Sequence, residues 1–243
     1  MSTYLTTGFV LRQRPWREHD RLYTVLTEGY GRLDLIGAGT AKPNSKLSPH
    51  LQPFAEVELM VARGKQLDRL AGAQLSTSYL KPPFSLPQVT VGAALLEVVR
   101  LYTSEAVNEA SLTQLLRRYL GKVAALPEVD WRPAARSLLA SFMTEVLSVS
   151  GLGLPLASCE SCRECLSGEV CFSWERHGFL HAPHVRSGEA VVGVAAEVVA
   201  WLTSNAAGVV NAAPAGALAF LTDYAQAQAG RELSSFRVLR ASM

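Results

Sequence analysis

The stretch C-E-S-C-R-E-C-L-S-G-E-V-C, from Cys159 to Cys171, contains every cysteine of the 243-residue chain. Cys159, Cys162, Cys165 and Cys171 have the spacing C-x2-C-x2-C-x5-C. Thiolates this close in sequence can converge on one ion, and four sulfur ligands suit tetrahedral zinc. We therefore expect these four cysteines to bind one structural Zn2+ ion. The chain segments before and after the cysteines must then both lie beside the ion.

Other interpretations of this stretch stay open. An iron–sulfur cluster also takes four thiolates, although the last spacing is longer than in a ferredoxin run. Disulfides or redox-active thiols are a further alternative. His181 and His184 follow at metal-ligand spacing, so Cys159 and Cys162 with these histidines form an alternative ligand set. Each histidine can also be a surface residue that hydrogen-bonds within its own loop.

Charge and hydropathy limit the class of protein. The net charge is +2, but residues 1–81 carry eleven Lys and Arg against seven Asp and Glu, and such a local excess favours a polyanionic partner. The first residues have neither the basic segment nor the long apolar run of a signal peptide, so we expect a cytoplasmic protein. The longest apolar segment, Ala190–Leu202, is interrupted by Gly193 and Glu197 and predicts a core helix rather than a membrane span.

The first third of the chain has the pattern of a small β-barrel. Short segments rich in β-branched, aromatic and aliphatic residues are separated by turn residues, and Gly29–Gly31 marks a hairpin. The expected strands are Tyr4–Arg12, Leu22–Thr27, Arg32–Ile36, Phe54–Ala62 and Leu67–Ser76. Five short strands in about 75 residues are typical of an OB-type barrel.

The rest of the chain is predicted to be helical after a proline-rich linker. The expected helices are Gln88–Thr103, a second with Asn108 as its N-cap, a third from Pro133 to Gly151, a fourth over Glu189–Ser204 capped by Ser187, and a last region from Pro214 that Gly230 divides. We therefore predict an α+β multidomain fold, with an OB-fold barrel in residues 1–80 followed by an α-helical domain in 81–157 and 187–243. A zinc-binding element, residues 158–186, is inserted between the two helical parts.

An OB barrel binds single-stranded nucleic acid through a basic groove and aromatic rings on which bases stack. The candidate DNA-binding residues are Arg12, Arg14, Arg17, Arg21, Arg32, Lys42, Lys46, Arg63, Lys65, Arg69, Trp16 and Tyr23, and Tyr30 is a further aromatic residue that could stack. The alternative is that Trp16 and Tyr23 belong to the barrel core and that the basic side chains are solvated.

Several stretches resemble the bacterial RecO family of recombination mediators and DNA repair proteins. They are G-F-V-L-R from Gly8, R-E-H-D-R-L from Arg17, L-T-E-G-Y-G-R-L from Leu26, L-Q-P-F from Leu51, the segment Leu95–Glu97, and the spaced series Phe142, Leu147, Gly151 and Pro155. One motif departs from the family. Where the family has a second C-x2-C pair, this chain has H-G-F-L-H-A-P-H from His177 to His184.

The resemblance implies an OB-fold N-terminus, a helical domain and a zinc element. It also implies a non-enzymatic protein that binds single- and double-stranded DNA and anneals complementary strands. With RecR, such a protein helps RecA load onto DNA covered by single-strand binding protein (SSB). It would act in the cytoplasm, at the bacterial nucleoid during repair.

Two other functions compete with this one. A zinc-dependent hydrolase keeps an open coordination position, which four thiolates do not leave, and the sequence has no H-E-x-x-H, P-loop or G-x-S-x-G motif. A protein-interaction scaffold with structural zinc could bind the acidic C-terminal tail of SSB. The candidate counter-charges for that tail are Arg117, Arg118, Lys122 and Arg132, for which a solvated helix face is the simpler interpretation.

Overall fold

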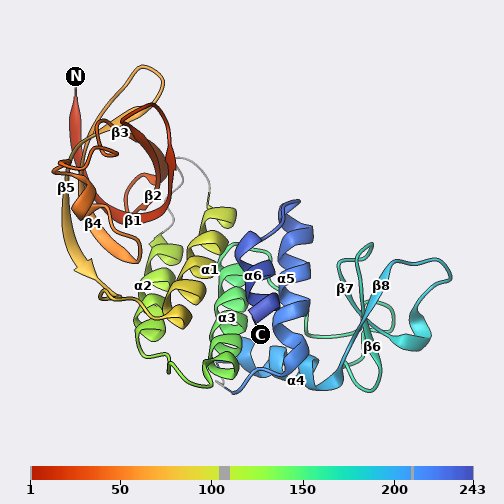
Figure 1. Ribbon diagram of the computed structural model, residues 1–243. Coiled ribbons are helices and arrows are strands. Elements are labelled where there is room, and N and C mark those ends of the chain that lie inside the picture. Colours follow the sequence, from red (N-terminus) through yellow and green to blue (C-terminus); the bar gives the residue numbers. More distant parts are fainter. Residues whose placement is uncertain (1, 104–109, 209–210, 243) are drawn as a thin grey trace. The chain divides into compact units, whose positions relative to one another are not determined.

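In the computed structural model, five strands near the N-terminus close into a barrel (Figure 1). The structure describes residues 2–103, 110–208 and 211–242. The strands of the barrel are β1 (Thr3–Pro15), β2 (Arg21–Thr27), β3 (Gly31–Gly37), β4 (Ala55–Ala62) and β5 (Asp68–Ser78), and the 3-10 turn η1 (Ser48–His50) precedes β4. Each strand overlaps one of the five predicted segments, so these predictions are confirmed.

The barrel closes in the order β1–β2–β3–β5–β4. β1 pairs with β4 along its first half and with β2 along its second half. The register of the β1–β2 pair shifts between Val10 and Arg12, close to the point where β1 changes its partner from β4 to β2. A β-bulge at such a point bends the strand. β3 and β5 pair in parallel over Leu35–Ile36 and Asp68–Arg69, which completes the cylinder. A closed five-stranded barrel followed by helices confirms the predicted fold class.

Side chains that point into the barrel form one apolar core. Alternation along β2 places Tyr23 and Val25 inside, where they meet Leu35 of β3 and Val57 of β4. Gly37 makes room for the large ring, because a Cβ atom there would lie 2.6 Å from the ring of Tyr23. The barrel is therefore filled by its own side chains, and a ligand can bind only on its outside or at its rims.

Two helices, α1 (Leu86–Tyr102) and α2 (Ala110–Ala124), lie in the same compact unit as the barrel, residues 1–129 and 237–242. Ser85 begins α1 with a capping box, in which its Oγ accepts from the Gln88 N–H and the Gln88 side chain accepts from the Ser85 N–H. The predicted N-cap of the second helix, Asn108, lies outside the described residues. The domain boundary at residue 80 remains a prediction, since this unit continues to residue 129.

A charged cluster joins α2 to the barrel within this unit. Arg117 donates hydrogen bonds to both carboxylate oxygens of Glu56 on β4, and its Nη2 donates to Glu28 at 2.7 Å. Tyr79 Oη also donates to Glu56, at 3.1 Å. The Glu56 side chain is only 10% exposed, so its charge needs these partners.

Replacing Arg117 with alanine is expected to lower the free energy of unfolding by about 2 kcal/mol, because Glu56 keeps a buried charge without its cation. The value is smaller than for a fully buried pair, because the Arg117 side chain is 34% exposed. Gln114→Ala, at an exposed position on the same helix, is the control and is expected to change stability by less than about 0.5 kcal/mol. Urea unfolding measures both variants, and equal effects would contradict a special role for Arg117.

The second compact unit, residues 130–236, contains the helices α3 (Trp131–Val149), α4 (Ala196–Ala206) and α5 (Ala215–Ala229). The last helix, α6 (Ser234–Ser242), begins in this unit, and its residues from 237 belong to the first. Phe142 and Val146 of α3 are fully buried, as the periodicity predicts. In the part of the chain that the structure describes, no helix has the length and hydrophobicity to span a membrane.

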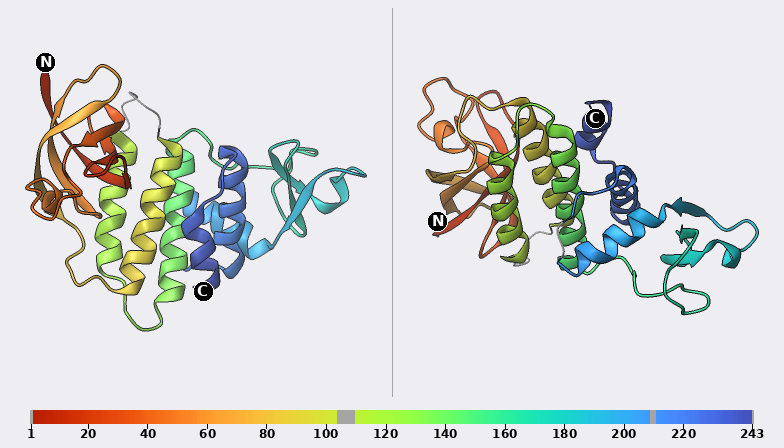
Figure 2. Two further views of the ribbon diagram at one scale, coloured as in Figure 1. Left: turned by 45° about the horizontal axis from the view of Figure 1, so that its top comes forward. Right: turned by 90° about the horizontal axis from the view of Figure 1, so that it is seen from below.

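A three-stranded sheet lies between α3 and α4 in the sequence. It consists of β7 (Gly178–His181), β6 (Val170–Ser173) and β8 (Val191–Val194), in this order, and the 3-10 turn η2 (Ala182–His184) follows β7. Figure 2 shows the sheet leading directly into α4. The predicted helix over Glu189–Ser204 is therefore wrong in its first part, because three valines and Gly193 form a strand and the helix begins at Ala196.

An aromatic cluster connects this sheet with α5. The ring of Phe172 on β6 lies 5.1 Å from Trp174, 5.2 Å from Phe179, 5.5 Å from Tyr224 and 5.7 Å from Phe220, all edge to face. Such pairs add to the stabilisation that burial gives. One face of the sheet therefore has an apolar core of its own.

Candidate metal centre and nucleic-acid interface

Four potential metal ligands converge next to the small sheet: Cys159, Cys162, His181 and His184. Their ligand atoms all lie within 4.8 Å of one another. Cys159 Sγ is 3.4 Å from His184 Nδ1, and Cys162 Sγ is 3.5 Å from His181 Nδ1. In a tetrahedral zinc site, with Zn–S about 2.3 Å and Zn–N about 2.0 Å, sulfur and nitrogen ligands are roughly 3.6 Å apart. The four residues therefore fit one zinc ion.

Backbone hydrogen bonds shape the turn that carries the two cysteines. The Ser161 N–H donates to Cys159 Sγ at 3.4 Å, and the Arg163 N–H donates to Cys159 O at 2.9 Å. Arg163 takes a positive φ of 65°, which lets the chain turn back after the second cysteine. The Glu160 N–H donates to Phe179 O at 2.9 Å, so the turn is joined to β7.

The two histidines come from the end of β7 and from η2. His181 directs Nδ1 toward Cys162, and its Nε2 lies 3.2 Å from the carbonyl oxygen of Cys165. If Nδ1 binds a metal, the ring proton must be on Nε2, which then donates to that carbonyl. The Ser167 N–H, 3.3 Å from the same Nε2, cannot donate to it in this tautomer. Metal-binding histidines are commonly oriented by a hydrogen bond from the ring nitrogen that does not bind the metal, as His181 would be by Cys165 O.

The electrostatic environment favours the ligand form of Cys159. Burial raises the pKa of its thiol, but hydrogen bonds from the backbone N–H groups of Cys162 and His181, and from the His184 ring before a metal replaces its Nδ1 proton, outweigh burial, and the pKa falls to about 6. The thiolate therefore predominates at neutral pH. Zinc binds the thiolate rather than the thiol.

The geometry favours the mixed ligand set over the four cysteine ligands. Cys165 is exposed in the loop before β6, and neither Cys165 nor Cys171 belongs to the convergent group among the described residues. Cys171 pairs with Leu180 while the neighbouring pair contains His181, so Cys171 and His181 project from opposite faces of the sheet. The ligand atoms that converge are those of the alternative set, Cys159 and Cys162 with His181 and His184.

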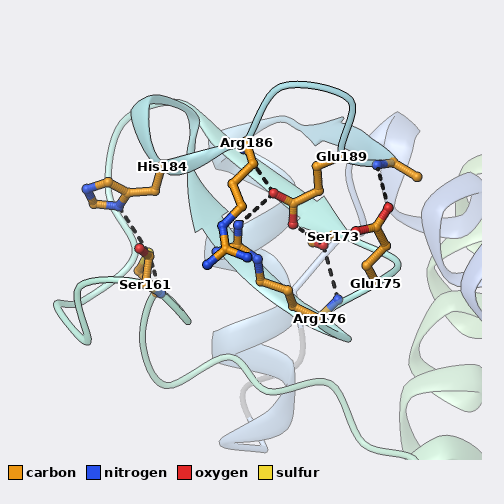
Figure 3. Close-up of polar contacts among 9 residues, drawn as sticks. Ser161, Ser173, Glu175, Arg176, His184, Arg186 and Glu189 are labelled. Atoms are coloured by element: carbon orange, nitrogen blue, oxygen red, sulfur yellow. Dashed lines mark hydrogen bonds and ion pairs between the residues drawn. The ribbon is translucent and has the colours of Figure 1, made fainter.

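A second polar cluster fixes the loops of this element (Figure 3). Glu189 accepts hydrogen bonds from Ser173 Oγ at 2.6 Å, from Arg176 Nη2 at 2.7 Å and from the Arg186 N–H at 3.0 Å. These hydrogen bonds lower the pKa of the Glu189 carboxyl, and the bond from Ser173 has the largest effect. Its side chain is only 3% exposed, so Arg176 and Glu189 form an internal ion pair rather than a surface for a partner.

The candidate DNA-binding side chains gather mainly at one end of the barrel. Strand register places Arg21 opposite Gly37, and Ile36 opposite Arg69, so β2, β3 and β5 meet there. The β1–β2 and β3–β4 loops are joined at the same end, since the Ala41 N–H donates to His19 O at 3.0 Å and the Gly39 N–H donates to Asp20 Oδ1 at 2.8 Å. We define the basic rim as Arg14, Arg17, Arg21, Lys42 and Arg69.

Most of the remaining candidates are exposed on the barrel or in its loops. Arg12, with its partner Thr24, is on the outer face of β1, because the core residues Tyr23 and Val25 face inward. The exposed candidates are Arg12, Arg14, Arg17, Lys42, Lys46, Arg63, Lys65, Arg69 and Trp16, and Arg21 is half-buried. Trp16 is 41% exposed in the β1–β2 loop and is therefore accessible to a base.

Two candidates are placed elsewhere by the structure. Tyr23 is 0% exposed in the barrel core, so it cannot stack on a base, and the alternative interpretation of this residue is the correct one. Arg32 donates to Thr103 O at 2.7 Å and to Arg100 O at 3.3 Å. These carbonyls lie at the C-terminal end of α1, where the helix itself supplies no partners, so Arg32 has a structural role.

The barrel with its basic rim and the Cys2His2 group on a separate sheet define an OB-fold protein with a helical unit and a metal-binding element. Residues 1–79, which include all of the barrel, match the family model described as "Recombination protein O N terminal". The chain thus carries a RecO N-terminal domain, and the resemblance found in the sequence is confirmed.

Longer similarities to three curated proteins named "DNA repair protein RecO" support this assignment. The chain is 34% identical to that of Frankia casuarinae over 67% of its own length and 65% of the relative. It is 30% identical to that of Synechococcus sp. over 74% and 62%, and 28% identical to that of Desulforamulus reducens over 74% and 68%. The chain thus matches about two thirds of the length of these relatives.

Proposed function

We propose that the chain is a non-enzymatic DNA-binding protein of recombinational repair. It binds single- and double-stranded DNA and anneals complementary strands. The observation that carries the proposal is the coincidence of two features: the residues that match the RecO N-terminal model are those that form the barrel and its basic rim. The name of the relatives, DNA repair protein RecO, supports the repair role.

The rim supplies the physical basis for annealing. Exposed Arg and Lys side chains neutralise phosphates, and the counterions that they release provide the sequence-independent part of the binding free energy. Because the barrel interior is filled, no deep pocket encloses bases there. Two strands held by their phosphates keep their base edges available, and the repulsion between the strands falls.

The metal centre has a structural role in this proposal. Two cysteines and two histidines complete a tetrahedral site and leave no open position for a substrate or a water molecule. A bound zinc ion would cross-link the turn before β6 to the turn after β7. Two features of the chain would support this site. The hydrogen bond from His181 to Cys165 O orients the imidazole ring, and backbone N–H groups stabilise the Cys159 thiolate.

The proposed partners follow from the RecO resemblance. With RecR, the protein would assist the loading of RecA onto DNA covered by SSB, at the nucleoid in the cytoplasm. Arg117 is a poor candidate for the acidic SSB tail, because Glu28 and Glu56 already accept its hydrogen bonds. Arg118 and Lys122 lie over the ring of Tyr119, at 5.4 Å and 4.3 Å, and remain candidates for that contact.

Salt titration tests the proposed function. If about four phosphates are neutralised, the affinity for single-stranded DNA is expected to fall roughly 50-fold between 50 and 200 mM salt. Annealing of complementary oligonucleotides should slow over the same range. Fluorescence anisotropy and a stopped-flow annealing assay measure the two effects. An affinity that does not depend on salt, or annealing no faster than without protein, would contradict the proposal.

A further inference from the structure

Three side chains from separate segments of the barrel form an aromatic platform. The ring centroids of Tyr4 on β1 and Tyr30 in the β2–β3 turn are 4.4 Å apart, with 43° between the ring planes. The guanidinium carbon of Arg63, which follows β4, lies 5.6 Å from the centroid of Tyr4. Tyr4 is half-buried and packs against the barrel core, whereas Tyr30 is 37% exposed and Arg63 is exposed. Tyr4 therefore supports the two groups that face the solvent.

Hydrogen bonds hold Tyr4 in place. Its Oη donates to Asp68 Oδ2 at 3.1 Å, and Asp68 Oδ1 accepts from the Gly64 N–H at 3.0 Å. Burial, followed by the bond to Asp68, raises the pKa of Tyr4 to about 12, so the hydroxyl remains a donor at neutral pH. Asp68 thus joins the platform to the β4–β5 turn.

The turn that carries Tyr30 is also fixed. Thr27 is 0% exposed, and its Oγ1 accepts from the Tyr30 N–H at 3.1 Å and donates to Gly31 O at 2.8 Å. The backbone of Tyr30 is therefore ordered before any ligand binds. An aromatic surface that is already ordered loses little conformational entropy when a base stacks on it.

Basic side chains lie close to the platform in the sequence. Lys65 is exposed in the β4–β5 turn, and Arg69 is exposed at the start of β5, where it belongs to the basic rim. The carboxylate between them, Asp68, is engaged by Tyr4 and Gly64. Arg63 and Lys65 are thus two cations of the same turn, and Arg63 itself contacts the ring of Tyr4.

We propose that Tyr4, Tyr30 and Arg63 form a stacking subsite for an unpaired nucleobase. The proposal rests on the proposed DNA-binding function and adds a preference for single strands. A base can stack on the open face of Tyr30 or on the guanidinium plane of Arg63, and every base has such a face. In a duplex the bases stack on one another inside the helix, so only unpaired DNA can use the subsite.

Tyr30→Ala tests the subsite directly. The probes are a single-stranded oligonucleotide with 2-aminopurine and the matching duplex, each titrated with the full chain. The substitution is expected to weaken single-strand binding about tenfold, within the range for one stacked base, and to reduce the quenching of 2-aminopurine. Duplex affinity and the salt slope should not change. Tyr30→Phe, which restores the ring, is expected to recover most of the affinity.

Leu5→Ala is the matched control. Leu5 adjoins Tyr4 on β1 and is 72% exposed, but alternation along the strand points it away from the platform. It should leave affinity and quenching unchanged. Equal losses for single strands and duplex in Tyr30→Ala, or no loss at all, would overturn the subsite while leaving the proposed function in place. If the unsubstituted chain binds no DNA, the proposed function fails first.

Discussion

Replacing Cys159 with serine is expected to abolish stoichiometric zinc binding and to unfold the element around β6 and β7. Cys159 is 0% exposed and is one of only two sulfur ligands in the convergent set. Metal binding at such sites provides roughly 10–16 kcal/mol of apparent folding free energy in isolated zinc peptides. Here the aromatic cluster around Phe172 retains part of the structure, so we expect a loss of roughly 4 kcal/mol or more.

Zinc content and thermal unfolding measure this effect, and protease cleavage within residues 158–186 localises it. DNA affinity is expected to change much less than stability, because the basic rim belongs to the other compact unit. If stability stayed equal and DNA binding were lost, the metal centre would have a direct role in binding DNA, contrary to the proposal.

Matched substitutions separate the two possible ligand sets. His184→Ala removes a ligand from the mixed set, whereas Cys171→Ser removes one only from the four-cysteine set. We expect the first to lose zinc and the second to keep it. X-ray absorption should accordingly show two sulfur and two nitrogen ligands. The opposite outcome for the two variants would restore the four-cysteine site.

The barrel could be predicted strand by strand, because its strands are long enough for their composition and alternation to be visible and turn residues separate them. β6, β7 and β8 were missed because each has only four residues. The valines of β8 also continue into the apolar residues of α4, so the sequence shows one long apolar run. A run of this kind does not reveal where a strand ends and a helix begins.

Closeness in sequence favours the four cysteines as metal ligands, but the structure brings a different group together. Cys165 is only three residues from Cys162, but the chain turns at Arg163 and leaves Cys165 exposed. His181 is nineteen residues from Cys162, yet the β6–β7 hairpin and its connection to the cysteine turn return it to 3.5 Å. The His-x2-His spacing is visible in the sequence. Whether the two histidines meet the two cysteines depends on the register of β6 and β7, which the spacing of residues along the chain does not determine.

The aromatic candidates show the same limit. Tyr23 and Tyr30 are both in or beside β2, and the sequence could not tell which is buried. In the structure the pleat places Tyr23 in the core, while Tyr30 lies beyond the strand and meets Tyr4 from the N-terminal strand. The sequence predicts that Arg32 binds DNA because it is a basic residue beside a barrel strand, and its partners, Arg100 O and Thr103 O, are about seventy residues away. Such distant contacts are set by the packing of α1, not by local sequence.

The double substitution Arg14→Glu with Arg17→Glu is expected to weaken binding of single-stranded DNA roughly 100-fold at moderate salt. Two phosphate contacts are lost, and two carboxylates then face the phosphates. The dependence of affinity on salt should become shallower by about 1.4 in the log–log slope, since each contact contributes about 0.7 on a single strand. Both side chains are exposed, so the melting temperature should not change.

The same loop offers a test of opposite sign. Glu18 lies next to Arg17, and its side chain is 88% exposed, so Glu18→Lys adds a cation to the rim without disturbing a packed group. We expect it to strengthen DNA binding several-fold and to steepen the salt slope by about 0.7. Arg231→Glu, an exposed reversal outside the barrel, controls for net charge with half the charge change of the double substitution. If it weakens binding as much as the double substitution does, DNA responds to the charge of the whole chain and the basic rim is not the interface.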